Sequence, residues 1–394
     1  MHHRLAALIG AIFWPLCLAP PLASADTALP ALEVNATASD ANPPIAASQP
    51  PPLNETQALS FYSHWDSDAV NYFSGGLNTG FIYNSVAVGG VTFKGDALGL
   101  PRSIFNFSVM GTRTGLGAEK LLGDSLINPS NIEGSRNRLV LDTAFWQQNW
   151  LSQPGLNIAT RTGVFDLSAD FINTGNAGQL LNSSFGLDPN MTGNFTASTF
   201  PQNGTGVVAT LDNRPAFNDT APLTLKLGLI QGDVNSQTQP FNQGVLNIAE
   251  GQWQPEAGSA YKIGVWQKRG NGLPDIHGGY LSAEHNLFAQ GAQSIDGFIR
   301  ASAARGSTSL GLNRYLSAGF NWQAPLANRP DDYLTVGFGG LQLQPTGQIE
   351  RLFEAAYIIK LSPRIYLQPD IQYIQHPNGN LPNAWVCIVR LHIE

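Results

Sequence analysis

The chain has 394 residues, of which 12% are charged and 41 are glycine, and its formal net charge is −7. A soluble domain usually has about 25% charged residues, so half that share favours a fold with one extended face that excludes charge. The acidic balance argues against nucleic-acid binding, which depends on a basic surface.

The amino terminus has the layout of a cleavable secretory signal peptide. Residues 1–25 begin with basic side chains, continue through an apolar stretch and end in the small residues Ala23–Ala25, which predicts cleavage after Ala25. Residues 26–59 are rich in Ala, Pro, Ser and Asn and predict a disordered lead-in. No other run of about 18 apolar residues occurs, so we expect no membrane-spanning helix. The folded domain is therefore expected at residues 60–394.

The start of this domain contains two segments of different sequence pattern. Phe61–Asp68 is a polar-aromatic stretch that we expect to pack inside or against the mouth of the fold, and the first strand is predicted from Gly75 to Val91. Further strands are predicted wherever apolar residues alternate with polar ones. Their centres lie near Phe105, Leu141, Thr160, Val208, Leu227, Ile248, Ile263, Leu281, Ile299, Phe320 and Val336.

Two long irregular stretches interrupt the strands. Gly111–Arg136 and Gly175–Gly206 are rich in Gly, Asn, Ser and Pro, and loops this long in a compact domain are usually functional or disordered. In a barrel we expect such a loop to fold inward and narrow the lumen. The second loop is favoured, because Asn182–Asn190 offers hydroxyl, amide and aromatic groups within one short segment.

The clearest alternation runs from Glu350 to Glu394. Three apolar rows, within 353–361, 365–373 and 385–393, face charged or polar residues of the opposite parity, which predicts strands with one apolar face. A soluble sandwich alternates in the same way. Tyr373 and Trp385 stand near the ends of their rows, as the interfacial aromatic girdles of a membrane barrel do, and this favours the barrel.

The predicted fold class is therefore all-β, an antiparallel transmembrane β-barrel. The strands recognised number fewer than 16, but residues 60–394 allow about 21 residues for each of 16 strands, as a barrel of that size requires. With an even strand number both termini face the periplasm. The turn Leu361–Arg364 is then periplasmic and the loop His376–Asn383 is external.

Several segments together resemble the carbohydrate-selective porins of the OprB type. The segment FEAAYIIKLSPRIYLQPDIQYIQHPNG (353–379) resembles the penultimate strand pair of that family, and NRPDDYLTVGFGGLQL (328–343) is similar to its Arg-Pro-Asp-Asp strand opener. Four more segments match in order and spacing: GGLNTGFIYN, SNIEGSRNRLVLDTAFWQQNW, TGVFDLSADF and NSSFGLDPN. The resemblance covers about residues 60–394. It implies a 16-stranded outer-membrane barrel that admits monosaccharides such as glucose by facilitated diffusion.

The carboxyl-terminal residue departs from the pattern of the family. Its members often end in Phe, which the outer-membrane assembly machinery reads, whereas this sequence stops at Glu394. A residue 395 would fall on the lipid-facing parity of Trp385 and Ile393. The departure bears on the efficiency of assembly and leaves the predicted fold unchanged.

Enzyme motifs are absent from the sequence. It has no Gly-x-Ser-x-Gly, His-Glu-x-x-His, Cys-x-x-Cys or phosphate-loop motif, and its histidines lack the spacing of metal ligands. We therefore expect no catalytic residues, no metal and no cofactor.

Polar side chains at the alternate strand positions that face the lumen are the candidates for contact with a solute. A sugar pore must exchange hydrogen bonds with the hydroxyl groups of the sugar and then release the sugar. Arg161 is the weakest of them, since its strand has poor parity. The same residues could instead solvate a wide lumen or form a transverse ladder of ion pairs. The candidates are Arg161, Lys226, Arg300, Glu354, Lys360, Gln368, Asp370, Gln372, Arg390 and His392.

The leading hypothesis is a passive outer-membrane channel for glucose-like monosaccharides. A plugged structural or adhesive barrel and a soluble glycan-binding β-protein are the alternatives. The expected partners are monosaccharide solutes, outer-membrane lipid and lipopolysaccharide, and the assembly machinery, with no nucleic acid. The channel is expected as a monomer or a homotrimer.

Overall fold

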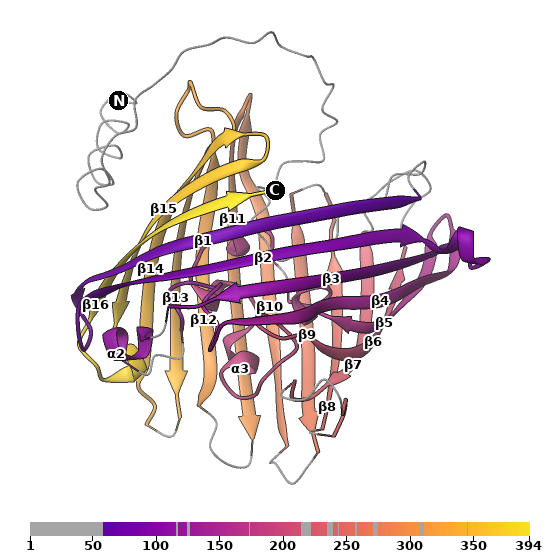
Figure 1. The fold of residues 1–394 in the computed structure, drawn as a ribbon, viewed down its shortest axis with the longest axis horizontal. Helices are drawn as coiled ribbons and strands as arrows, with labels where there is room; N and C mark the ends of the chain where they lie inside the picture. Colours follow the sequence, from indigo (N-terminus) through magenta and orange to yellow (C-terminus); the bar gives the residue numbers. More distant parts are fainter. Residues whose placement is uncertain are drawn as a thin grey trace.

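A computed structural model describes residues 58–394, except 116, 124–126, 173, 214–221, 235–238, 243, 257, 271–274, 307–310 and 345. The predicted signal peptide and nearly all of the predicted lead-in lie outside this part of the chain. The described residues form 16 strands in one closed sheet. Figure 1 shows the chain running up and down around this sheet, with the carboxyl-terminal strands beside the first one.

Each strand pairs with its neighbours in sequence, and β1 pairs with β16 to close the barrel. All pairs are antiparallel. The strands are β1 (Leu59–Gly75), β2 (Gly80–Lys94), β3 (Ser103–Arg113), β4 (Arg138–Gln153), β5 (Leu156–Phe165), β6 (Gly204–Asp212), β7 (Leu223–Gln231), β8 (Val245–Trp253), β9 (Ala260–Arg269), β10 (Ile276–Gln290), β11 (Gln293–Gly306), β12 (Leu312–Gln323), β13 (Tyr333–Leu343), β14 (Ile349–Ser362), β15 (Ile365–Gln375) and β16 (Ala384–Ile393). The predicted all-β barrel of 16 antiparallel strands is confirmed.

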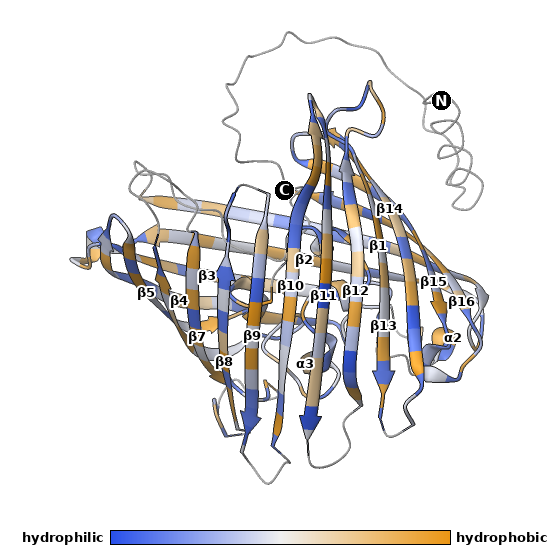
Figure 2. Ribbon diagram, turned by 180° about the vertical axis from the view of Figure 1, so that it is seen from behind, coloured by the Kyte–Doolittle hydropathy of each residue, from blue (hydrophilic) through white to orange (hydrophobic). Residues whose placement is uncertain are grey.

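The outward faces of the strands are apolar and uncovered. On β7, Leu223, Leu225, Leu227 and Leu229 alternate with inward residues, and Leu227 is 52% exposed. Figure 2 shows the same alternation of apolar and polar positions along many strands. A monomeric soluble protein rarely exposes an apolar surface of this extent, whereas the wall of a membrane barrel does.

The first strand differs from the prediction. Phe61–Asp68 was expected to pack at the mouth, but it forms the first half of β1 and supplies the sixteenth strand. Its inward positions carry Asp66 and Asp68, which pair in register with His392 and Arg390 of β16. These partners come from the other end of the chain, so no local pattern could reveal them.

The connections at the two ends of the barrel differ in length. At one end they are mostly short, as at residues 154–155, 291–292 and 363–364, whereas the two longest loops, 114–137 and 166–203, leave from the other end. This asymmetry is typical of outer-membrane barrels, in which the short turns are periplasmic. No helix in the described part of the chain is long and apolar enough to cross a membrane.

Candidate functional site

Two loops enter the barrel and fill much of its interior. We call residues 114–137, between β3 and β4, loop A, and residues 166–203, between β5 and β6, loop B. Loop A contains the short helix α2 (Ala118–Leu122), and loop B contains three short 3₁₀ turns and α3 (Pro189–Thr192). Figure 1 shows α3 inside the ring of strands.

Local capping sets the path of loop B. Asp166 accepts a hydrogen bond from the backbone N–H of Ser168. Asp188, which directly precedes Pro189, accepts one from the backbone N–H of Asn190. An acidic residue followed by proline is a favoured start for a helical turn, because the side chain satisfies a free N–H and the ring fixes φ. Burial raises the pKa of both Asp166 and Asp188 above the ordinary value, while the hydrogen bonds they accept act against this rise.

Apolar packing fixes loop B to the inner wall on two sides. One cluster joins Phe171, Met191 and Phe195 of the loop to inward residues of β6 to β10, such as Leu246 and Trp266. A second cluster joins Leu180, Leu181 and Phe185 to inward residues of β1, β2, β11 and β14 to β16. The protein therefore has its hydrophobic core inside the barrel, and loop B is part of that core.

Polar anchors on β14 and β15 hold the backbone of loop B. Glu354 accepts hydrogen bonds from the N–H groups of Leu181 and Asn182, and its side chain is fully buried. Gln372 accepts from the side-chain amide of Asn182 at 3.0 Å, and it donates to the carbonyl of Pro129 in loop A at 2.9 Å. Gln368 donates to the carbonyl of Gln179 at 2.8 Å.

Three predicted cations act on the same loop from the other wall. Arg300 donates to the carbonyl of Phe185 at 2.7 Å. Lys226 donates to the carbonyl of Asp170 at 2.7 Å, and Arg161 donates to the carboxylate of Asp170 at 2.9 Å. Each cation thereby satisfies an acceptor in loop B that the fold removes from bulk water.

The remaining four candidates lie nearer the seam or the turns. Asp370 accepts a hydrogen bond from Gln372 at 3.0 Å, and Lys360 lies 3.6 Å from Asp331 in the β12–β13 turn. Arg390 forms a bidentate pair with Asp68, with both N···O distances 2.7 Å, and His392 bonds Asp66 at 2.7 Å. Six of the ten predicted residues thus bond to loop B, and solute contact by any of the ten stays a prediction.

Inside the barrel, the described residues line at least two cavities. The larger, about 1180 Å³, opens toward the short-turn end, where Arg390 and His392 lie on its wall. The smaller, about 540 Å³, lies toward the long-loop end, under Glu119 and Ser135. The other eight predicted residues are not among the described residues that surround either cavity. Six residues border both cavities, and we call them the constriction: Asn128, Glu133, Thr192, Thr199, Phe200 and Pro201.

The constriction brings together different chemical groups. Asn128 offers an amide, Thr192 and Thr199 offer hydroxyls, and Phe200 offers a ring that packs beside Val86 and Met110 of the wall. Glu133 has a buried carboxylate oxygen that accepts no hydrogen bond. Burial raises the pKa of Glu133 to about 7, although the neighbouring amide of Asn84 lowers it. This group can therefore be neutral or anionic near neutral pH.

The sequence analysis missed the constriction residues and favoured a different part of loop B. Asn182–Asn190 was expected to face the solute. Its residues Ser183, Phe185, Gly186 and Leu187 line the larger cavity, whereas Asn182, Asp188 and Asn190 are buried against the wall. Asp188, for example, accepts a hydrogen bond from Ser302 at 2.6 Å. The two irregular stretches predicted to fold inward, 111–136 and 175–206, contain all six constriction residues, but nothing in the sequence singled out these six within them.

Across residues 58–394, outside the gaps given above, no three His, Cys, Asp or Glu side chains are arranged to hold a metal ion.

The carboxyl-terminal third of the chain matches a known family. The model of the carbohydrate-selective porin, OprB family, matches residues 270–394, which confirms the resemblance for this part. No curated protein matches the sequence.

Solved structures are similar over most of the chain. The high-pH structure of Pseudomonas putida OprB has a TM-score of 0.72 at 15% identity, covering 85% of this chain and 94% of that one. Its low-pH structure has a TM-score of 0.57 at 13% identity, with 85% and 92% covered. An anion-selective porin from Comamonas acidovorans has a TM-score of 0.53 at 11% identity, with 85% and 100% covered. At these identities the similarity shows that the fold is that of the porins.

Proposed function

We propose that the chain is an outer-membrane porin through which small neutral carbohydrates diffuse passively. The porin fold and the family match at residues 270–394 support a channel. The observation that carries the proposal is the constriction, where loops A and B meet between two cavities and present an amide, a carboxylate, two hydroxyls and an aromatic ring.

The constriction suits a solute that carries many hydroxyl groups. A pyranose that sheds water there can exchange hydrogen bonds with Asn128, Glu133 and Thr192, while its apolar face lies against the ring of Phe200. Passage also requires that each contact be weak enough to release the solute. Asn128 and Thr192 are exposed and meet that condition, because water competes for each of their hydrogen bonds.

The ten candidate residues have a supporting role in this proposal. Buried anchors such as Glu354 and Arg300 keep loop B at a fixed distance from loop A, and this distance sets the width of the passage. We assign no catalytic role to any residue. The expected partners are monosaccharides, outer-membrane lipid and lipopolysaccharide and the assembly machinery, and the expected state is a monomer or a homotrimer.

Liposome swelling tests the proposal directly. Swelling should be fast in monosaccharides and should slow as sugars grow larger. Thr192→Val should change the rates for sugars more than those for salts, because it removes one hydroxyl from the constriction. Thr196→Val is the matched control, since Thr196 borders only the smaller cavity. Equal effects of the two changes would contradict the assignment of the constriction.

One observation favours a second candidate, a plugged barrel. The cluster around Phe171, Met191 and Trp266 packs loop B against the inner faces of β6 to β10 and so occupies this side of the lumen. If the constriction were closed as well, the barrel would be structural or adhesive. Absence of ion conductance in planar bilayers would establish this candidate.

A further inference from the structure

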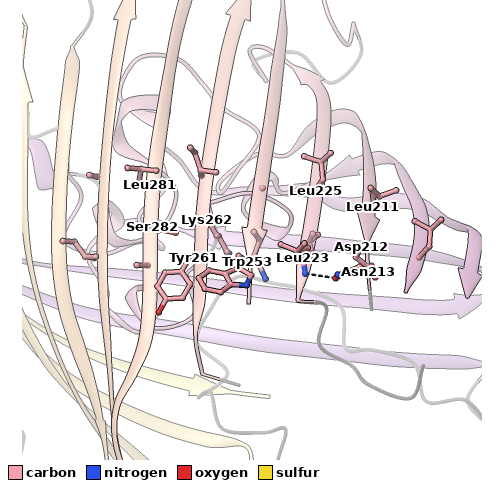
Figure 3. Close-up of a pocket in the computed structure, with 18 residues that line it drawn as sticks. Leu211, Asp212, Asn213, Leu223, Leu225, Trp253, Tyr261, Lys262, Leu281 and Ser282 are labelled. Carbon is pink, nitrogen blue, oxygen red and sulfur yellow. Dashed lines mark hydrogen bonds between the residues drawn. The ribbon is translucent and has the colours of Figure 1, made fainter. Parts of the chain in front are cut away.

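A concave apolar surface lies on the outside of the barrel, away from the constriction. It crosses the outward faces of β6 to β11 near their short-turn ends and has a volume of about 850 Å³. Figure 3 shows Tyr261 and Trp253 side by side at one end of this surface, with Leu281, Leu225 and Leu211 toward the other. We call this surface the outer groove.

Small residues create the outer groove. Gly251, Ala283 and Ala301 form its floor. Larger outward side chains flank them, including Leu281 at 57% exposure and Ile263 at 60% exposure. A Cβ atom at Gly251 would meet only Ile263, at 3.8 Å, so the position has room for a side chain and the sequence leaves it empty.

The rim of the groove is aromatic, and a polar cluster outside the groove lining adjoins it through Tyr261. Trp253 and Tyr261 stack there with ring centroids 5.3 Å apart. Nδ1 of His285 lies 3.2 Å from the hydroxyl of Tyr261 and 2.8 Å from that of Ser259. Glu256 lies 4.0 Å from the same nitrogen, with its side chain 65% exposed. Aromatic residues of this kind stand at the headgroup level of a membrane.

We propose that the outer groove binds one phospholipid whose zwitterionic headgroup carries a primary ammonium. An acyl chain fills the groove, the ammonium meets Glu256, and the phosphate meets His285. When the hydroxyls of Tyr261 and Ser259 donate to Nδ1, the ring proton of His285 is on Nε2, where it can donate to a phosphate oxygen. The proposal requires the membrane setting but not the sugar selectivity proposed above.

Charge and shape favour this ligand over the alternatives. The multiple phosphates of lipopolysaccharide need a cluster of Lys and Arg, and they lie in the leaflet opposite to the short turns. The rim instead pairs one carboxylate with one imidazole, which matches a lipid headgroup that carries both a positive ammonium and a negative phosphate. The wall of a second 16-stranded barrel is too broad to reach the floor of a groove of about 850 Å³, whereas a flexible acyl chain can enter it.

Native mass spectrometry of the protein released from vesicles tests the proposal. The vesicles contain phosphatidylethanolamine and phosphatidylglycerol in equal amounts. The wild type should retain one phosphatidylethanolamine, and Gly251→Leu should lose it because the new side chain fills the groove. Gly89→Leu is the matched control, since Gly89 of β2 faces outward with open space around its Cβ position and lies outside the groove. Equal retention by the two variants would overturn the proposal.

A second variant tests the headgroup. Glu256→Gln should reduce the preference for phosphatidylethanolamine over phosphatidylglycerol about two- to fivefold, the size typical of one exposed ion pair. Retention without any headgroup preference in the wild type would contradict the assigned rim. Release as dimers or trimers that Gly251→Leu dissociates would show that a second copy, and not a lipid, occupies the groove.

Discussion

Glu354 offers the sharpest test of how loop B is held. This fully buried carboxylate accepts hydrogen bonds from the N–H groups of Leu181 and Asn182. Glu354→Ala leaves both donors without a partner, at a cost of about 1–3 kcal/mol each. Even at the lower limit, about 2 kcal/mol for the pair, the population of detached loop should rise about 30-fold.

Single-channel recording and limited proteolysis report this detachment. Glu354→Ala should increase current noise and expose loop B to protease, while the barrel stays folded. Glu350→Ala is the matched control on the same strand and face, because Glu350 accepts a hydrogen bond from the N–H of Asn378, in the β15–β16 loop, at 2.7 Å. If both variants behaved as the wild type, the anchoring of loop B by Glu354 would be refuted.

Three further predictions concern charge and burial. Because the pKa of Glu133 is raised to about 7, its carboxyl group is neutral below that pH and anionic above it. The cation selectivity of the channel, measured by reversal potentials, should therefore rise between about pH 5 and about pH 9. Glu133→Gln should abolish this rise. Leu227→Arg, in the middle of β7, should lower the free energy of unfolding by about 2–4 kcal/mol, measured by denaturant titration in vesicles. Leu223→Arg, at the end of β7, should lower it by only about 0–1 kcal/mol. Equal losses would contradict a lipid-facing wall. Arg390→Ala should cost about 3–5 kcal/mol, because it leaves the buried carboxylate of Asp68 without its charged partner. Arg269→Ala, which breaks an exposed pair with Asp275, should cost about 0–1 kcal/mol in the same titration.

Strand alternation made most of the wall predictable. The leucines of β7 and the apolar rows of β14 to β16 face outward because lipid contact requires apolar residues at every second position. β1 was missed because the acids of its first half pair with β16. The alternation of β16 was recognised, but its pairing with a strand at the other end of the chain leaves no local signal in the sequence.

The site was less predictable than the wall. The alternation of apolar and polar residues correctly placed Glu354, Gln368 and Gln372 inside the barrel. Alternation cannot show whether water or a loop lies opposite an inward side chain. Loop B covers these residues, and it turns them from expected solute contacts into anchors. The constriction residues lie in irregular chain, where no period exists, and the contact between loops A and B alone brings them together.

The central claim is that sugar passes between loops A and B and touches the constriction. Its most direct test is the ion current through single channels in planar bilayers while glucose is added. The account predicts an open current that glucose reduces in a saturable way. Phe200→Ala should enlarge the open current and weaken the block on the order of two- to tenfold, the value of one aromatic contact. A wild-type channel without current, or a glucose block that Phe200→Ala leaves unchanged, would contradict the claim.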